Sequence, residues 1–588
     1  MGSFFKIFFA SLLALIVFTG VALLFMVFLI TGLTSKEATI TQRSSVLVLD
    51  LSQDFSERKL ENPIVQFSGD KDAEIPTQYE MVRLIRHAKS DSLIKGIYIK
   101  CNDNANGFAS SAELRLALED FKKSKKFIIA YGDYISQKAY YVASVADKVY
   151  CNPKGAVEWK GFAAQLYFLK NTLAKLEIQP QIFYDGKFKS ATEPLREEKM
   201  TDANRLQTTV WLGDIYGEFL QKVSESRSVD TATLHRYANE YMIQSPSDAE
   251  KYHLLDGVRY DDEVKDEIRK LLGLQRDARI QFVLPGSYLD AVTLNKYGDK
   301  DRIAVIYAQG DIVYGKGEEG QIGSDEYRNL IRKARTDKNV KAIVLRVNSP
   351  GGSSLASEII WREITLARAE GKPVVVSMGD LAASGGYYIS CGADSIFAEP
   401  NTITGSIGVF GIIPNMQSFF NHKLGVTFDQ VKTGPYADIG SISRPMNDVE
   451  KKIIQNEIDT IYHDFKTRVA VGRNKDISFI DSIAQGRVWT GTRARDLGLV
   501  DRIGNLDDAI ASAAHMAKIT EFTLREYPEP RSLLDVLTNS YKKTVKSKAI
   551  EEELGKEGYL IYQNIKRVKE MSGTVQARLP FEFSFESN

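Results

Sequence analysis

The sequence contains one pattern twice, and this duplication constrains the fold more than any other feature. GDLAASGGYYIS, which begins at Gly379, aligns without gaps with GDYISQKAYYVA, which begins at Gly132. The aspartates and the paired tyrosines match, but Ser384 of the later copy corresponds to Gln137 of the earlier one. The chain therefore consists of two related halves, and only the second keeps a hydroxyl at this position.

Short segments rich in Val, Ile and Tyr alternate with helical patterns in the same order in both halves. These segments are residues 45–51, 94–102 and 126–133 in the first half and residues 302–310, 340–352 and 372–380 in the second. Strands that alternate with helices predict a mainly parallel sheet covered by helices. The repeat is far longer than a solenoid unit, so it predicts two tandem α/β domains. We expect these domains at residues 41–290 and 291–525, followed by a helical extension and tail at 526–588.

An apolar segment precedes the first half. From Ile7 to Leu33 there is no charged residue. As an α-helix at about 1.5 Å per residue, this segment covers about 40 Å, which exceeds the roughly 30 Å of a bilayer core. It predicts a transmembrane signal anchor within residues 1–40, although small residues near its end leave removal of the segment as an alternative. Lys6 favours a cytoplasmic N-terminus, so we expect the rest of the chain outside the cytoplasm.

Charge and the distribution of cysteine and histidine argue against some classes of function. Acidic and basic residues balance at 76 each, so there is no electrostatic reason to expect a nucleic-acid partner. The three cysteines, Cys101, Cys151 and Cys391, lie in apolar contexts without metal-ligand spacing, and the six histidines form no paired motif. We expect buried thiols, and neither a metal ion nor another cofactor.

A second difference between the halves concerns a lysine. In the first half, the motif GKFKSATEP carries Lys187 and Lys189. The related GPYADIGSI of the second half has Ala437 opposite Lys189. The first half thus has the lysine without the serine, and the second has the serine without the lysine, so the two halves placed face to face would supply one Ser–Lys pair. Lys187 is a competing candidate, because it points to the same side as Lys189 in an extended segment.

Such a pair has a direct chemical use. A serine hydroxyl is a weak nucleophile until a base removes its proton. Lysine is a base only in its neutral form, which at an ordinary pKa near 10.4 is about one molecule in 2500 at pH 7. Burial disfavours the ammonium form and lowers the pKa. A lysine enclosed between two domains could therefore activate Ser384.

Two further motifs of the second half suit acyl transfer. In VNSPGGSS, the N–H groups of Gly351 and Gly352 precede a helical pattern and can donate to an oxyanion, whereas the first half has CNDNANG there. In TITGSIGVFG, Ser406 supplies a second hydroxyl that can hold a neutral lysine in line. The first half has Trp159 at that position. The half without the serine therefore lacks these elements too.

Each of these residues also has a purely structural interpretation. Ser384 could be the N-cap of a helix. Lys189 could be a solvated surface lysine, and Ser406 and the Pro-Gly-Gly sequence could simply form turns. The comparison of the two copies favours the catalytic interpretation.

Together, SGGYYIS, NSPGGS, TGSIG and GKFKSA resemble the motifs of the signal peptide peptidase A family, also called protease IV, in its long duplicated form. The resemblance extends from about residue 40 to residue 525. It implies tandem domains of the crotonase and Clp protease type and a serine protease with a Ser–Lys dyad, in which Ser384 is the nucleophile, Lys189 the general base and Ser406 the group that orients the lysine. It further implies a homotetramer, anchored at the outer (periplasmic) face of the bacterial cytoplasmic membrane, that degrades remnant signal peptides.

Two other functions compete with a peptidase. The same fold serves acyl-CoA chemistry, in which paired oxyanion donors stabilise a thioester enolate, but that chemistry needs neither a Ser–Lys pair nor a membrane anchor. A non-enzymatic scaffold of the stomatin-partner type would predict the loss of Ser384 or Lys189, and both are present. The cleavage preference, the oligomer number, and whether the pair forms within one chain or between neighbours stay open.

Overall fold

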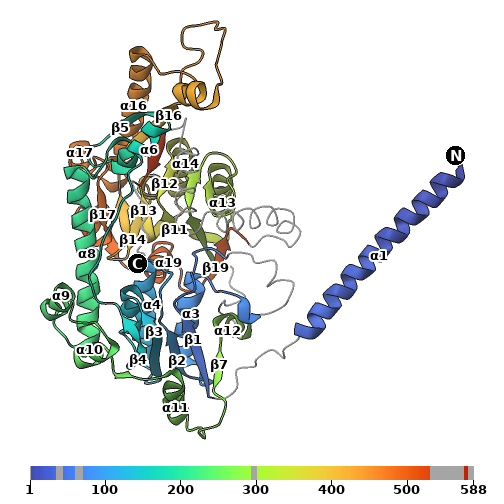
Figure 1. The fold of residues 1–588 in the computed structure, drawn as a ribbon, viewed down its shortest axis with the longest axis vertical. Helices are drawn as coiled ribbons and strands as arrows, with labels where there is room; N and C mark the ends of the chain where they lie inside the picture. Colours follow the sequence, from blue (N-terminus) through green and yellow to red (C-terminus); the bar gives the residue numbers. More distant parts are fainter. Residues whose placement is uncertain are drawn as a thin grey trace.

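The computed structural model describes residues 2–34, 44–59, 71–292, 294, 301–529 and 575–579. A long N-terminal helix, α1 (Gly2–Thr34), lies apart from a body in which helices pack around three β-sheets (Figure 1). Within α1, Phe4–Val21 has a mean hydropathy of 2.3 and no residue buried against the body, so this stretch is long and apolar enough to cross a membrane. The predicted α/β class is confirmed.

The sheet of the first half is parallel at every pair of strands. Its strand order is β6-β4-β3-β2-β1-β7. The strands are β1 (Ser45–Asp50), β2 (Ile94–Lys100), β3 (Phe127–Ile135), β4 (Lys148–Val157), β6 (Gly257–Val258) and β7 (Gln281–Val283). The helices of this half are α3 (Gln78–Ser90), α4 (Phe108–Lys122), α5 (Gln137–Ala143), α6 (Lys170–Lys175), α7 (Glu193–Arg196), α8 (Asp202–Arg227), α9 (Thr231–Asn239), α10 (Pro246–Lys251), α11 (Asp261–Leu271) and α12 (Pro285–Ala291).

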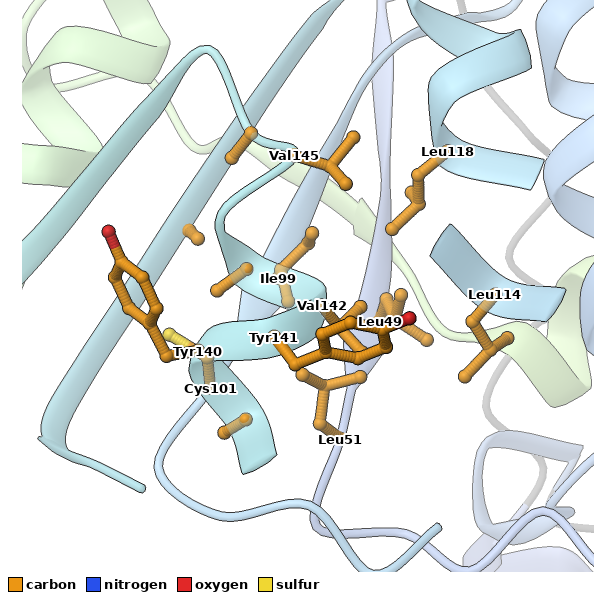
Figure 2. Close-up of a cluster of buried hydrophobic side chains, with 14 of the residues drawn as sticks. Leu49, Leu51, Ile99, Cys101, Leu114, Leu118, Tyr140, Tyr141, Val142 and Val145 are labelled. Atoms are coloured by element: carbon orange, nitrogen blue, oxygen red, sulfur yellow. The ribbon is translucent and has the colours of Figure 1, made fainter. Parts of the chain in front are cut away.

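Figure 2 shows the part of the first-half core that surrounds α5. Tyr140 and Tyr141 of this helix lie in one buried cluster with Leu49 and Ile99 of the adjacent strands. Gln137 is the first residue of α5, so the position that corresponds to Ser384 begins a helix packed into an apolar core.

The sheet of the second half repeats the central arrangement of the first. Its strand order is β17-β15-β13-β11-β8-β19, with β14 beside β13 and β18 beside β14, and only β15 and β17 pair antiparallel. The strands are β8 (Arg302–Gln309), β11 (Val340–Ser349), β13 (Val374–Ala383), β14 (Ser395–Ala398), β15 (Ile403–Gly405), β17 (Val488–Thr490), β18 (Arg502–Ile503) and β19 (Thr523–Tyr527). The helices are α13 (Ser324–Thr336), α14 (Ser354–Ala369), α15 (Gly385–Ser390), α16 (Asp448–Arg473), α17 (Ile477–Ile483), α18 (Gly491–Asp496) and α19 (Leu506–Met516).

A third sheet joins the two halves, in the order β10-β9-β12-β20-β16-β5. Its strands are β5 (Gln179–Asp185), β9 (Asp311–Val313), β10 (Gln321–Gly323), β12 (Gly351–Ser353), β16 (Val409–Asn415) and β20 (Gln576–Arg578). All of β5, from the first half, pairs antiparallel with all of β16, from the second. This pairing delivers the segment after β5, which contains Lys189, to the second half.

Most of the predicted C-terminal extension, residues 530–574 and 580–588, lies outside the described residues. Its described part contains the end of β19 and the strand β20, and no helix. This strand forms by pairing with β12 and β16, which are distant in the sequence, so local composition gives no sign of it.

A buried ion cluster also holds the halves together. Arg346 of β11 is 1% exposed and donates to Glu57 Oε1 at 2.7 Å and to Glu113 Oε1 at 2.8 Å. Both carboxylates come from the first half and are themselves buried. Asp380 of the second half makes a further contact with the first half. Its carboxylate accepts a hydrogen bond from the backbone N–H of Ala109, at the start of α4, at 2.8 Å.

Arg346→Met should lower the free energy of unfolding by about 3–5 kcal/mol, because it leaves two carboxylates buried without their cation. Urea denaturation at neutral pH measures this change. Lys341→Met is the matched control, since Lys341 forms a 3.3 Å ion pair with Asp301 in which both side chains are more than one-third exposed. The control should cost about 0–1 kcal/mol. Equal effects of the two substitutions would contradict the structural role of the cluster.

Candidate active site

The loop that carries Lys189 is fitted tightly to the second half. The backbone N–H of Phe188 donates to Gln485 O at 2.7 Å. Gly186 has φ +110°, and a Cβ there would lie 2.6 Å from the carbonyl carbon of Gln485. A Cβ on Gly486 would lie 2.6 Å from Cβ of Lys189. Glycine is therefore required at both positions for the two halves to approach this closely.

Buried hydrogen bonds within the first half fix the same loop from behind. Glu193, which is 2% exposed, accepts from Thr201 Oγ1 at 2.6 Å and from Asn204 Nδ2 at 2.8 Å. Gln207 of α8 donates to Ser190 Oγ at 2.8 Å. Because these polar groups are satisfied only in this arrangement, the backbone on both sides of Lys189 is held in place.

Ser384 lies at the sharp turn from β13 to α15. Its φ and ψ of 54° and −113° are strained for a residue with a side chain, and such strain is concentrated at functional sites. Ser384 occupies the N-cap position of α15, but its side chain makes no capping hydrogen bond. Its backbone N–H donates to Gly405 O at 2.8 Å, which ties the turn to the segment that carries Ser406.

The structure brings Lys189, Ser384 and Ser406 together. Lys189 Nζ lies 2.9 Å from Ser384 Oγ, 3.1 Å from Ser406 Oγ and 3.2 Å from Ser406 O. Ser406 itself has a positive φ of 50° and is anchored by its N–H, which donates to Arg487 O at 2.7 Å. Lys187, by contrast, is exposed, with its Nζ 6.0 Å from the centre of the neighbouring Phe188 ring.

Burial lowers the pKa of Lys189 well below its usual range. Its side chain is 1% exposed, and desolvation is the only cause of the shift. A neutral amine has two N–H groups and one lone pair. The carbonyl oxygen of Ser406 can only accept, so it takes one N–H, and Ser406 Oγ can take the other. The lone pair is then left for the hydroxyl of Ser384.

Three glycines, Gly351, Gly352 and Gly385, lie close together beside Ser384. Gly351 and Gly352 have φ values of +103° and +157° and lie in β12, which ends one residue before the start of α14 at Ser354. The N–H of Gly351 donates to Ser349 Oγ at 3.2 Å. A Cβ on Gly351 would lie only 2.7 Å from the nitrogen of Gly385. The sequence analysis does not name Gly385 as a donor, although this glycine directly follows Ser384.

The three cysteines are all buried. Burial raises the pKa of the Cys391 thiol to about 12 and that of Cys151 to about 12 as well, and it raises the pKa of Cys101 further. These thiols stay protonated near neutral pH, so none of them offers a competing nucleophile.

Comparison with known proteins shows the family to which this chain is related. Residues 120–275 and 366–520 each match the model of peptidase family S49. "Protease 4" of Salmonella typhi is 38% identical over 477 residues, which are 80% of this chain and 76% of that protein. "Protease 4" of Haemophilus influenzae is 32% identical over 563 residues, 91% of this chain and 90% of that protein. A relative from Enterococcus faecium, named provisionally as signal peptide peptidase SppA, is 36% identical over 241 residues, 40% of this chain and 69% of its own.

These matches define a serine protease. More particularly, the chain belongs to peptidase family S49, whose model it matches once in each half. Family membership confirms the predicted resemblance, and the match of the family model in each half confirms the tandem duplication of one α/β domain.

The low pKa of Lys189 gives a testable pH dependence of stability. Because this pKa is lower in the folded than in the unfolded protein, the unfolded state binds more protons between the two values, and the free energy of unfolding rises with pH in that window. The free energy of unfolding of the wild-type protein should therefore rise relative to that of Lys189→Met between about pH 7 and about pH 9.5. The rise should be about 1.4 kcal/mol for each pH unit that lies between the pKa values of Lys189 in the folded and unfolded states.

Urea unfolding of both proteins at the two pH values measures this difference. Lys187→Met, at an exposed position in the same loop, is the control and should follow the wild-type pH dependence. Parallel curves for wild type and Lys189→Met would mean that Lys189 titrates alike in the folded and unfolded states.

Proposed function

We propose that this protein is a membrane-anchored endopeptidase that degrades remnant signal peptides with a Ser–Lys dyad. The observation that carries the proposal is the 2.9 Å approach of Lys189 Nζ to Ser384 Oγ at a buried seam between the two halves. Burial keeps the amine neutral, and a neutral amine within hydrogen-bond reach is what a serine nucleophile requires.

In the proposed mechanism, Ser384 Oγ attacks the scissile carbonyl while Lys189 takes its proton. Ser406 holds the amine in line through its hydroxyl and carbonyl oxygens. The N–H groups of Gly352 and Gly385 donate to the oxyanion. Gly385 replaces Gly351, the donor expected from the sequence, because the N–H of Gly351 donates to Ser349 Oγ instead. Lys189 then gives the proton to the leaving amine. A water molecule hydrolyses the acyl-enzyme by the same steps in reverse.

The competing functions fit the site less well. Acyl-CoA chemistry uses oxyanion donors, but it has no need of a buried lysine delivered by the other half of the chain. A scaffold without activity has no need to bury a lysine against a strained serine, which costs stability at neutral pH. Both features favour peptide hydrolysis.

The proposed substrate and location rest on further observations. The provisional name of the Enterococcus relative refers to signal peptides. Such peptides remain in the membrane after cleavage, and α1 would anchor the enzyme there. We place the catalytic body on the outer face of the cytoplasmic membrane. Exposed apolar side chains on one loop suit the homotetramer that the resemblance implies; they are Leu424, Val426, Phe428, Val431 and Tyr436.

Ser384→Ala and Lys189→Ala should each lower kcat/KM for a short leucine-rich peptide by at least about 1000-fold, because each removes one member of the proposed Ser–Lys dyad. Ser406→Ala should cost about 10-fold, the value of one orienting hydrogen bond. Lys187→Ala should keep wild-type turnover and serves as the matched control. A serine-reactive probe should label Ser384 in wild type. Full activity of Ser384→Ala would overturn the assignment of the nucleophile.

Membrane attachment is tested separately. The full chain should stay in the membrane pellet after an alkaline wash, whereas a variant without residues 1–40 should be soluble, because α1 supplies the apolar span. Protease added to intact spheroplasts should degrade the body. If the added protease degraded the body only after the spheroplasts were lysed, the body would lie on the opposite side of the membrane.

A further inference from the structure

One short segment of the second half, residues 485–488, contacts both sides of the candidate active site. The carbonyl oxygen of Gln485 accepts a hydrogen bond from the N–H of Phe188, in the loop that carries the lysine, at 2.7 Å. The carbonyl oxygen of Arg487 accepts one from the N–H of Ser406 at 2.7 Å. This stretch, the spacer segment, therefore sets the separation between the lysine loop and Ser406.

Gln207 of α8 fastens the lysine loop to the spacer segment from the side of the first half. Its side chain is 1% exposed. Its Nε2 donates to Phe188 O at 3.1 Å and to Ser190 Oγ at 2.8 Å. Its Oε1 accepts from the N–H of Val488, the last residue of the spacer segment, at 3.3 Å. One buried amide thus holds the residues on both sides of Lys189 and the far end of the spacer segment.

A glutamine amide is matched to these partners. Phe188 O can only accept a hydrogen bond, and the N–H of Val488 can only donate one, so the amide of Gln207 has one possible orientation. Methionine has a similar length but no polar group of this kind to offer. Asparagine has the same amide on a side chain shorter by one methylene, so it cannot reach both backbone groups at once.

The helix that carries Gln207 is attached to the second half at another point as well. Asp214 lies two turns further along α8, on the same face. Its carboxylate accepts from Thr490 Oγ1 at 2.9 Å and from Arg493 Nη2 at 2.8 Å. A substitution at Gln207 therefore leaves α8 in contact with the second half, and its effect should be confined to the lysine loop.

We infer that Gln207 is a positioning residue of the proposed dyad, which keeps the Lys189 amine at hydrogen-bond distance from Ser384 and Ser406 and closed to water. The inference rests on the proposed function. Gln207 acts through the backbone on both sides of the lysine and takes no part in the transfer of the serine proton. Without its amide, the buried backbone groups that it satisfies would need water as a partner, and water would reach the lysine loop.

Entry of water has a consequence for the base. Desolvation is the only cause of the low pKa of Lys189, so the charged side chains around the loop, which are Glu193, Lys187 and Arg487, do not set it. A hydrated amine regains its ammonium form, and its pKa rises toward the usual value. Loss of Gln207 should therefore move the activation of Ser384 to higher pH.

The test follows the labelling of Ser384 by a fluorophosphonate in the full chain, in detergent, between about pH 5 and about pH 10. The pH at which the labelling rate is half-maximal reports the pKa of the base and does not depend on how much of the protein is folded. In Gln207→Met this pH should rise by about one unit, and below it the rate should fall about tenfold, because one pKa unit changes the neutral fraction tenfold. Gln207→Asn should shift this pH in the same direction.

Gln221→Met is the matched control, because Gln221 lies on the exposed side of the same helix, where it donates to Glu225 Oε1 at 3.0 Å. Its half-maximal pH should equal that of wild type. A wild-type value in either Gln207 variant, even with a lower melting temperature, would show a purely structural role and overturn the inference while the proposed function stands. Wild type that is never labelled at Ser384 and hydrolyses no peptide would overturn both.

Discussion

The antiparallel pairing of β5 with β16 is the interaction on which the site depends. It is the strand contact that carries a segment of the first half into the sheet of the second, and Lys189 follows β5 within a few residues. A lysine amine becomes a base at neutral pH only where water is excluded from it. A flexible connection could not exclude water, whereas a full-length strand pair closed by glycines at Gly186 and Gly486 does.

The duplication explains why neither half could act alone. In the first half, Gln137 stands where the second half has Ser384, and Trp159, which is 1% exposed, fills the place of Ser406. Apolar side chains of the first half pack around α5 (Figure 2), and this half supplies the loop that carries Lys189. The strain at Ser384 and the desolvation of Lys189 both cost stability, and burial of the apolar cores of the two halves offsets that cost.

The sequence predicted the features that depend on local residue patterns and on the comparison of the two repeated halves. Alternating strands and helices identified the two sheets, and the mismatch of the two copies singled out Ser384 and Lys189, which the structure brings within 2.9 Å. It could not predict the third sheet, because β5 and β16 lie far apart in the chain and pair only in the folded tertiary structure. The proposed role of Gly385 as an oxyanion donor depends on the path of the backbone at the strained turn of Ser384, which no residue pattern encodes.

The closure of the third sheet bears on the chemistry of the lysine. β20 lies between β12 and β16, and β16 is also the strand that positions β5 and, through it, the lysine loop. Ser384 and Ser406 are both fully buried within this closed arrangement. Exclusion of water lowers the pKa of Lys189, so the sheet that joins the two halves also favours the neutral form of the base. The third sheet therefore does more than hold the halves together, because the same strand pairing both delivers the lysine and removes the water that would keep it protonated.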